Sequence, residues 1–191
     1  MPDAELPRRL GPMDAMFIFG DSPNAPQVIG SVCEFEGRVP FKRFQNSLND
    51  RLQFVPRYRQ ILVEAPLFAG MPSWEDDVDF DINNHIFEHK LDKPGDDAQF
   101  IALAQDLFQG KLDMKRPLWE IHLIYGLTGN RTGAVTRVHH CLVDGIAGVE
   151  LMRVLFDISP EAPKIPKKTF HPRRTPGRGS LFYNAMIDNL A

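Results

Sequence analysis

A chain of 191 residues with 43% hydrophobic residues is long enough to bury one sizeable core or two small ones. Its net charge of −3 argues against a nucleic-acid-binding protein, which would carry an excess of lysine and arginine. No apolar run approaches the ~20 residues that cross a bilayer, and the first 20 residues lack the layout of a signal peptide. The two cysteines, Cys33 and Cys141, lie far apart, which fits a reducing compartment, so we expect a cytoplasmic protein.

The first half of the chain is predicted to contain three strands and a helix. Residues 27–36 are rich in Val, Ile and Phe with partial alternation, which predicts a strand. Residues 58–63 and 86–91 indicate two further strands, with an acidic loop over residues 73–81 between them. The helix is indicated by apolar residues at spacings of three and four, ended by a proline: Phe41, Phe44, Leu48, Leu52, Val55 and then Pro56.

The second half is predicted to begin with an amphipathic helix over residues 96–108, whose acidic start suits the positive end of a helix. Side chains then alternate from Trp119, residues 128–130 supply turn chemistry, and residues 134–138 return as a second strand of a hairpin. A further helix is expected from Gly148. Helices mixed with hairpin-connected strands predict an α/β (α+β) fold, with a mixed sheet flanked by helices.

A basic, proline-rich segment over residues 159–180 divides the chain. It contains six lysines and arginines against one acidic residue, Glu161, together with five prolines, and so carries a net charge of +5. Prolines restrict their neighbours to extended conformations, so a semi-rigid linker is predicted between a lobe over residues 1–158 and a helix over residues 181–191 capped by Ser180. We expect that helix to have nothing to pack against. The linker is interpreted as a solvated connector, with a tether to anionic lipid headgroups as the alternative.

The residues most suited to catalysis lie at the end of the predicted hairpin. His139 and His140 are followed by Asp144 and Gly145. A neutral imidazole can take a proton from an alcohol near neutral pH, since its unperturbed pKa is about 6.5, and such a base is worth roughly 10²- to 10⁴-fold in rate. Asp144 is the carboxylate that could fix the loop, and Gly145 permits a tight turn into a helix.

Other interpretations of these histidines have to be weighed. A lone pair of histidines is more often structural than catalytic. A metal site made of His139, His140 and Asp144 is disfavoured, because adjacent strand residues point to opposite faces; no metal is expected. For the same reason the cysteine after His140 is not favoured as a nucleophile. His85 and His89 lack the glutamate of a zinc-protease helix and are predicted to be surface or packing residues.

The pattern His139-His140-x-x-x-Asp144-Gly145 resembles the signature of the chloramphenicol acetyltransferase-like, coenzyme A-dependent acyltransferases. Three further segments resemble, in the same order, the bacterial wax ester synthase/acyl-CoA:diacylglycerol acyltransferases: residues 11–17, 55–60 and 116–120. The similarity runs from about residue 10 to the linker. It implies one lobe of the chloramphenicol acetyltransferase-like fold and the N-terminal half of such an enzyme.

The resemblance also implies a reaction. His140 would be the general base that deprotonates a lipid alcohol, which then attacks the thioester of a long-chain acyl-CoA to form a triacylglycerol or a wax ester without an acyl-enzyme. Asp144 would be a structural carboxylate, His139 a supporting residue and Gly145 the turn. Acyl-CoA is a substrate, and no cofactor is expected.

Pro117, Leu118 and Trp119 would shape either the acyl-binding wall or the core, and we favour the core for Trp119. The second-half motif of the resembled family, a Ser-Asn-Val-Pro-Gly-Pro-like segment, is absent, so a second acyltransferase lobe is expected as a partner. The alternative is a truncated, non-catalytic lipid-binding or partner-binding half-domain. A peripheral location at a membrane or lipid droplet is a further expectation.

Overall fold

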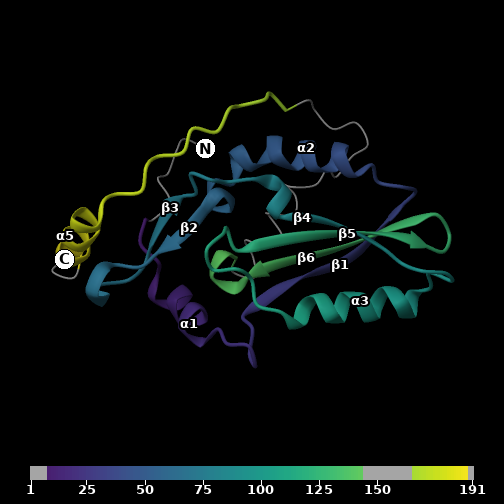
Figure 1. Ribbon diagram of the computed structural model, residues 1–191, viewed down its shortest axis with the longest axis horizontal. Coiled ribbons are helices and arrows are strands. Elements are labelled where there is room, and N and C mark those ends of the chain that lie inside the picture. Colours follow the sequence, from purple (N-terminus) through teal and green to yellow (C-terminus); the bar gives the residue numbers. More distant parts are fainter. Residues whose placement is uncertain (1–7, 144–164, 189–191) are drawn as a thin grey trace.

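The computed structural model describes residues 8–143 and 165–188. Its centre is a four-stranded sheet, in which the spatial order is β1 (Val28–Glu36), β6 (Arg131–His139), β5 (Trp119–Leu127) and β4 (Ile86–Lys90) (Figure 1). β1 and β5 both run antiparallel to β6, whereas β4 runs parallel to β5. The predicted mixed sheet is confirmed, and the predicted hairpin forms its central pair.

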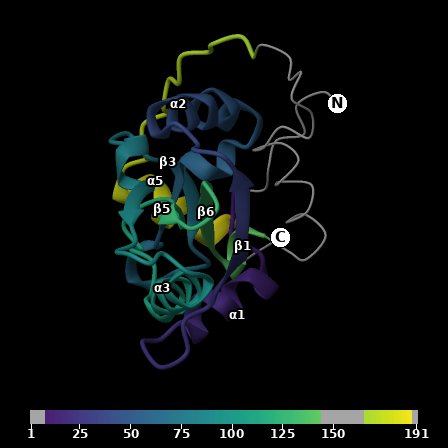
Figure 2. The same cartoon turned by 90° about the vertical axis from the view of Figure 1, so that its right-hand side faces the viewer.

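Two helices cover opposite faces of this sheet, α2 (Phe41–Arg51) and α3 (Asp97–Gln109) (Figures 1 and 2). Successive side chains of a strand point to opposite faces, so Trp119 packs with the residues of α2 while Ile124 packs with Phe100 of α3. Both faces of β5 are therefore buried, and the predicted alternation along this strand is confirmed.

The ends of the helices follow from local chemistry. The Asp96 side chain accepts a hydrogen bond from the Gln99 N–H, and the Gln99 side chain accepts one from the backbone of Asp96, which forms a capping box at the start of α3. α2 ends at Arg51, earlier than predicted. The residues that follow form two 3₁₀ turns, Leu52–Phe54 and Pro56–Arg59, because a proline cannot continue an α-helix.

A second, two-stranded sheet pairs β2 (Gln60–Val63) with β3 (Ser73–Asp76) in antiparallel register. The prediction of a loop throughout residues 73–81 is wrong for the part that forms β3. Trp74 is buried there, and the Arg57 guanidinium lies 4.6 Å from the centroid of its ring. A segment of four residues is too short to show the alternation of a strand. The backbone pairing with β2 is what makes it one.

The structure also contains a helix that the sequence analysis did not predict, α1 (Pro12–Gly20). Proline at the first helical position and Asp14 in the first turn are favourable start signals. The segment is apolar on nearly every side, which conceals the helical period. α1 packs against the 3₁₀ turn at the end of β6 through Ala15, which is buried.

The C-terminal part of the linker, residues 165–177, is extended and held against the fold (Figure 1). The ring of Phe170 lies 4.8 Å from the Arg59 guanidinium and meets Phe80 edge-on at 6.4 Å. Arg173 forms an ion pair with Asp76 at 3.5 Å. These contacts attach this part of the linker to the lobe, while most of its residues are exposed.

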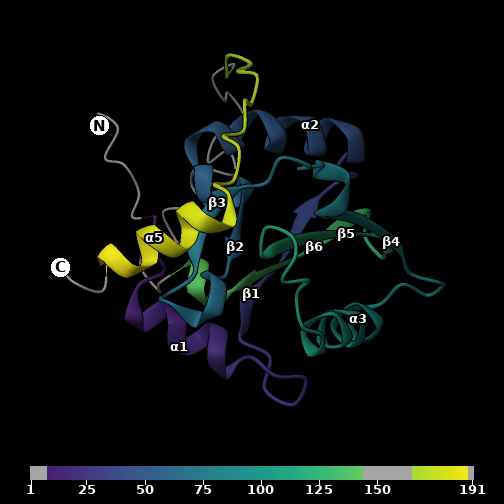
Figure 3. The same ribbon diagram turned by 60° about the vertical axis from the view of Figure 1, so that its left-hand side comes forward.

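The last described helix, α5 (Arg178–Asp188), begins before Ser180, so the prediction that Ser180 caps it is wrong. The expectation that this helix has nothing to pack against is also wrong. Leu181 and Ala185 are buried, and Ala185 lies against Gly70 in the turn between β2 and β3 (Figure 3). Among the helices of residues 8–143 and 165–188, none is long and apolar enough to span a membrane.

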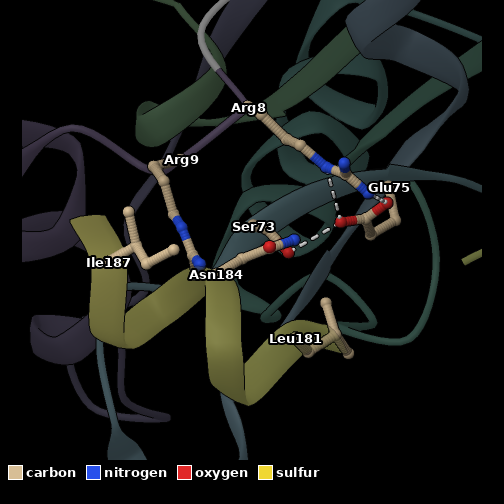
Figure 4. A pocket seen from close by; sticks show the side chains of 7 residues that line it. All are labelled: Arg8, Arg9, Ser73, Glu75, Leu181, Asn184 and Ile187. Carbon is tan, nitrogen blue, oxygen red and sulfur yellow. Dashed lines mark hydrogen bonds and ion pairs between the residues drawn. The ribbon is translucent and has the colours of Figure 1, made fainter. Parts of the chain in front are cut away.

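A cavity of about 390 Å³ separates α5 from β3 and from the N-terminal segment (Figure 4). Arg8 forms an ion pair with Glu75 at 2.7 Å, and the Ser73 hydroxyl donates to the same carboxylate at 2.8 Å. The Glu75 carboxylate that lines this cavity is thus already paired within the protein.

Candidate active site

The histidine pair lies where β6 ends. His139 is the last residue of β6, and His140 opens the 3₁₀ turn His140–Leu142. The His140 N–H donates to the carbonyl of Gln27, the residue before β1, at 2.8 Å. The prediction that the hairpin delivers both histidines at its end is confirmed. Asp144 and Gly145, like the helix expected from Gly148, lie outside the described residues.

His140 is half-buried beneath α1. Its ring stacks on the ring of Phe17, with the centroids 3.8 Å apart and the planes at 15°. Its Nδ1 atom is buried and has no hydrogen-bond partner among the residues described. The helix that the sequence analysis missed therefore sets the orientation of the predicted base.

His139 is fully buried. Its Nδ1 accepts a hydrogen bond from the Cys141 N–H at 3.2 Å, so the ring proton resides on Nε2. Nε2 lies 3.9 Å from Oδ2 of Asp21. Burial lowers the pKa of His139 although Asp21 opposes the shift, so this imidazole is neutral at neutral pH. The two histidines therefore occupy different environments.

Asp21 is the residue of this site that the sequence analysis missed. Its side chain is 2% exposed, pairs with Lys111 at 2.8 Å and accepts a hydrogen bond from the Gln27 N–H at 2.9 Å. Burial raises the pKa of the Asp21 carboxyl, but the hydrogen bonds from Lys111 and Gln27 outweigh it and leave the pKa below its ordinary value. In the sequence Asp21 stands among turn residues and carries no signal of proximity to His139.

Cys141 is buried next to Leu118. Burial, together with the charge of Asp14, raises the pKa of its thiol to about 12. A thiolate is the nucleophilic form of cysteine, so Cys141 is unsuited to that role at neutral pH. This agrees with the sequence-based argument against a thiol nucleophile.

Pro117, Leu118 and Trp119 are all buried. The Leu118 carbonyl accepts the His139 N–H at 2.9 Å, which ties this segment to the histidine pair. Trp119 is 1% exposed, and its indole N–H donates to the Tyr58 carbonyl at 2.8 Å. The interpretation of Trp119 as a core residue is confirmed.

Three further histidines of the lobe, His85, His89 and His122, serve packing and internal hydrogen bonds. His85 is buried and stacks on Trp119, with the ring centroids 4.5 Å apart. His89 Nε2 contacts His122 Nδ1 at 3.0 Å, and His122 Nε2 lies 3.3 Å from Glu120. Within the described parts of the chain, no three or more His, Cys, Asp or Glu side chains are arranged to hold a metal ion.

Comparison with known proteins places this arrangement in a family. Residues 10–189 match the model of the wax ester synthase/diacylglycerol acyltransferase catalytic domain. A Mycobacterium tuberculosis protein named "Probable diacyglycerol O-acyltransferase tgs3" is 32% identical over 185 residues, which cover 95% of this chain and 68% of that protein.

Solved structures show the same fold. The wax ester synthase/diacylglycerol acyltransferase from Marinobacter aquaeolei VT8 has a TM-score of 0.68 at 24% identity, over 83% of this chain and 40% of that chain. A starter condensation domain of rhizomide synthetase RzmA, in complex with C8-CoA, has a TM-score of 0.57 at 15% identity, over 70% of this chain and 31% of that chain. The predicted chloramphenicol acetyltransferase-like lobe is confirmed by these likenesses. The chain belongs to the wax ester synthase/diacylglycerol acyltransferase family.

Proposed function

We propose that this chain supplies the general base, His140, for transfer of a long-chain acyl group from acyl-CoA to the hydroxyl of a lipid alcohol. The observation that carries the proposal is a half-buried imidazole at the end of β6, fixed by stacking on Phe17, within a chain that matches the family over residues 10–189. A base held in one orientation is what general base catalysis requires.

The reaction is a direct acyl transfer. Because Nδ1 of His140 is buried, we assign the proton acceptor to Nε2. As Nε2 takes the proton of the alcohol, the alcohol oxygen attacks the thioester carbonyl. The C–S bond then breaks, and the coenzyme A thiolate takes the proton from the imidazolium, which restores the base. No step uses the Cys141 thiol, whose pKa is raised to about 12, and none requires a cofactor other than the substrate acyl-CoA.

A second acyltransferase lobe is the proposed partner. The chain spans 68% of the tgs3 relative and 40% of the Marinobacter structure. Three large side chains of α1 point outward: Met13 is 70% exposed, Met16 66% and Phe19 71%. Since α1 also carries Phe17 beside His140, a partner that covered this face would close the site from water and strengthen its electrostatics. We propose α5, beyond the linker, as the start of that lobe.

The acceptor follows from the relatives rather than from the site. The tgs3 relative is named a diacylglycerol O-acyltransferase, which favours a diacylglycerol as acceptor and triacylglycerol as product. A fatty alcohol, giving a wax ester, is the second acceptor that the family name offers.

The test measures ester formation from radiolabelled palmitoyl-CoA with dioleoylglycerol or hexadecanol, by the chain alone and with a second-lobe partner. His140→Ala should abolish the ester produced by whichever assembly is active. His171→Ala is the matched control, because His171 is exposed on the linker. Full activity of H140A would overturn the proposal. Absence of ester from wild-type protein in both assemblies would favour a non-catalytic half-domain that binds lipid or a partner.

The second proposal concerns location at a membrane or lipid-droplet surface. Leu67, in the turn between β2 and β3, is 83% exposed, and α5 contacts that turn (Figure 3). Tyr183, Met186 and Ile187 of α5 are exposed as well. Exposed apolar side chains on two elements in contact, next to a basic linker, suit an anionic lipid interface. Vesicle binding that weakens in Leu67→Ser and as salt rises would support this location; binding unaffected by both would contradict it.

A further inference from the structure

A buried carboxylate next to the histidine pair has no assigned role. Asp21 follows α1 and is nearly inaccessible, with an exposed fraction of 2% for its side chain. Burying an ionised carboxylate is costly unless it is paired, and Lys111, which follows α3, supplies the pair at 2.8 Å. The Lys111 ammonium also donates to the backbone carbonyl of Asp21 at 3.0 Å. Lys111 therefore fixes both the charge and the position of Asp21.

Asp21 reaches both histidines by separate routes. Its Oδ2 atom lies 3.9 Å from Nε2 of His139, the ring nitrogen that carries the proton because Nδ1 accepts from the Cys141 N–H. Its Oδ1 atom accepts a hydrogen bond from the Gln27 N–H. The backbone carbonyl of Gln27 in turn accepts a hydrogen bond from the His140 N–H. One side chain thus faces the ring of the first histidine and supports the backbone of the second.

The charges around His139 act in opposite directions. Burial is the largest influence and lowers the pKa of His139, while Asp21 raises it and the interactions with His140 and Lys111 lower it. Within residues 8–143 and 165–188, the ionisable groups that face the ring are Asp21 after α1, Lys111 after α3, and the adjacent histidine. The pKa of His139 therefore reports on the Asp21–Lys111 pair. Loss of the Asp21 charge should lower this pKa, and loss of the Lys111 charge should raise it.

We propose that Asp21, held by Lys111, is a positioning residue for the His139–His140 pair: its charge faces the Nε2 edge of His139 at 3.9 Å, without a hydrogen bond, and through Gln27 it fixes the backbone that carries His140. The proposal rests on the proposed function, since positioning matters only if His140 is the base. A positioned general base contributes roughly 10²- to 10⁴-fold to the reaction rate, and a base that loses its orientation loses part of that factor. Asp21→Asn should therefore lower kcat by about 10-fold or more, with little change in KM.

The test combines NMR with kinetics on the full 191-residue chain. Correlation spectra of the ring nitrogens in protein labelled with ¹⁵N-histidine give the tautomer and pKa of His139, assigned with His139→Gln. Asp21→Asn should lower that pKa further, whereas Lys111→Met should raise it. General damage to the fold would not produce opposite signs. Asp97→Asn, which removes an exposed ion pair with Arg131, is the matched control and should leave His139 unchanged.

Steady-state kinetics then distinguish a positioning role of Asp21 from a purely structural one. In an active assembly, Asp21→Asn should lower kcat, and Asp21→Glu should restore part of it because the carboxylate returns. An unchanged pKa of His139 in D21N would overturn the proposal. So would a kcat equal to that of wild type. If wild-type protein makes no ester, the proposed function fails, while the NMR response still decides whether Asp21 controls His139.

Discussion

The ring of Phe17 lies flat against the ring of His140, with 3.8 Å between their centroids and 15° between their planes. Phe17 belongs to α1 and His140 to the turn after β6, so the contact joins two distant parts of the chain. Aromatic pairs are worth about 0.5–1.5 kcal/mol beyond their buried area. This stacking therefore restricts the orientation of the proposed base.

Replacing Phe17 should impair the chemical step more than substrate binding. Phe17→Leu keeps apolar volume but removes the flat ring, so we expect kcat to fall by about 2- to 10-fold, the rate equivalent of 0.5–1.5 kcal/mol. Phe54→Leu is the control, because Phe54 lies in the 3₁₀ turn after α2 and is 56% exposed. Steady-state kinetics of ester formation decide the matter, and equal kcat values for the two variants would contradict a role for the stacking.

Gly133 should be essential for the packing of α3 on the sheet. A Cβ atom added there would lie 2.4 Å from Cε2 of Phe100, too close without movement of the buried ring. Overpacking of this kind costs typically 1–3 kcal/mol, so Gly133→Ala should lower the free energy of unfolding by about that amount. Gly177→Ala is the control, since nothing lies within 4 Å of its added Cβ. Urea denaturation followed by circular dichroism measures both, and equal midpoints would contradict the prediction.

Stability should fall as the pH drops from about 7.5 to 5.5, near the ordinary histidine pKa of about 6.5. Burial lowers the folded-state pKa of His85, His89 and His139. The unfolded chain then binds more protons than the folded chain, so stability that is complete above the unfolded pKa is lost as the pH falls through it. Carboxyl groups with lowered pKa values, such as Asp21, keep their contribution to stability across this range and lose it only at more acidic pH.

Denaturant titrations across this range measure the slope of stability against pH. His89→Gln removes a half-buried member of the set and should make the slope shallower, whereas the exposed His171 should leave it unchanged when replaced by Gln. Equal stability of the wild-type protein at pH 7.5 and pH 5.5 would show that the buried histidines titrate normally.

Phe170 should hold the linker against the lobe. Its ring contacts Arg59 and Phe80, and a cation–π contact of this kind is worth about 0.5–1 kcal/mol at exposed sites. Phe170→Ala should therefore speed tryptic cleavage after Lys167 and Lys168 about 2- to 5-fold through local release of the segment. Timed digestion with mass spectrometry gives the rates. His171→Ala should cleave like wild type, and equal rates for F170A would show that another contact retains the linker.

The elements that the sequence predicted best are those whose patterns are local and long. β5 alternates over nine residues, α3 has a capping box and an amphipathic run, and the turn between β5 and β6 has Gly129 and Asn130 with positive φ angles. β3 and α1 were missed for opposite reasons. β3 is too short to show a period, and α1 is apolar on so many sides that no period emerges.

By itself the sequence determined the sheet-forming hairpin and the histidine pair at its end, because each rests on spacing between near neighbours. Its motifs also resembled the family that the comparisons show. The tertiary structure alone decided what surrounds the pair. Phe17 stacks on His140, and Asp21 with Lys111 faces His139. These contacts join separate elements, so their geometry arises only when α1, α3 and β6 pack together. Packing brings the charged groups close to one another and buries them, and both effects shift their pKa values.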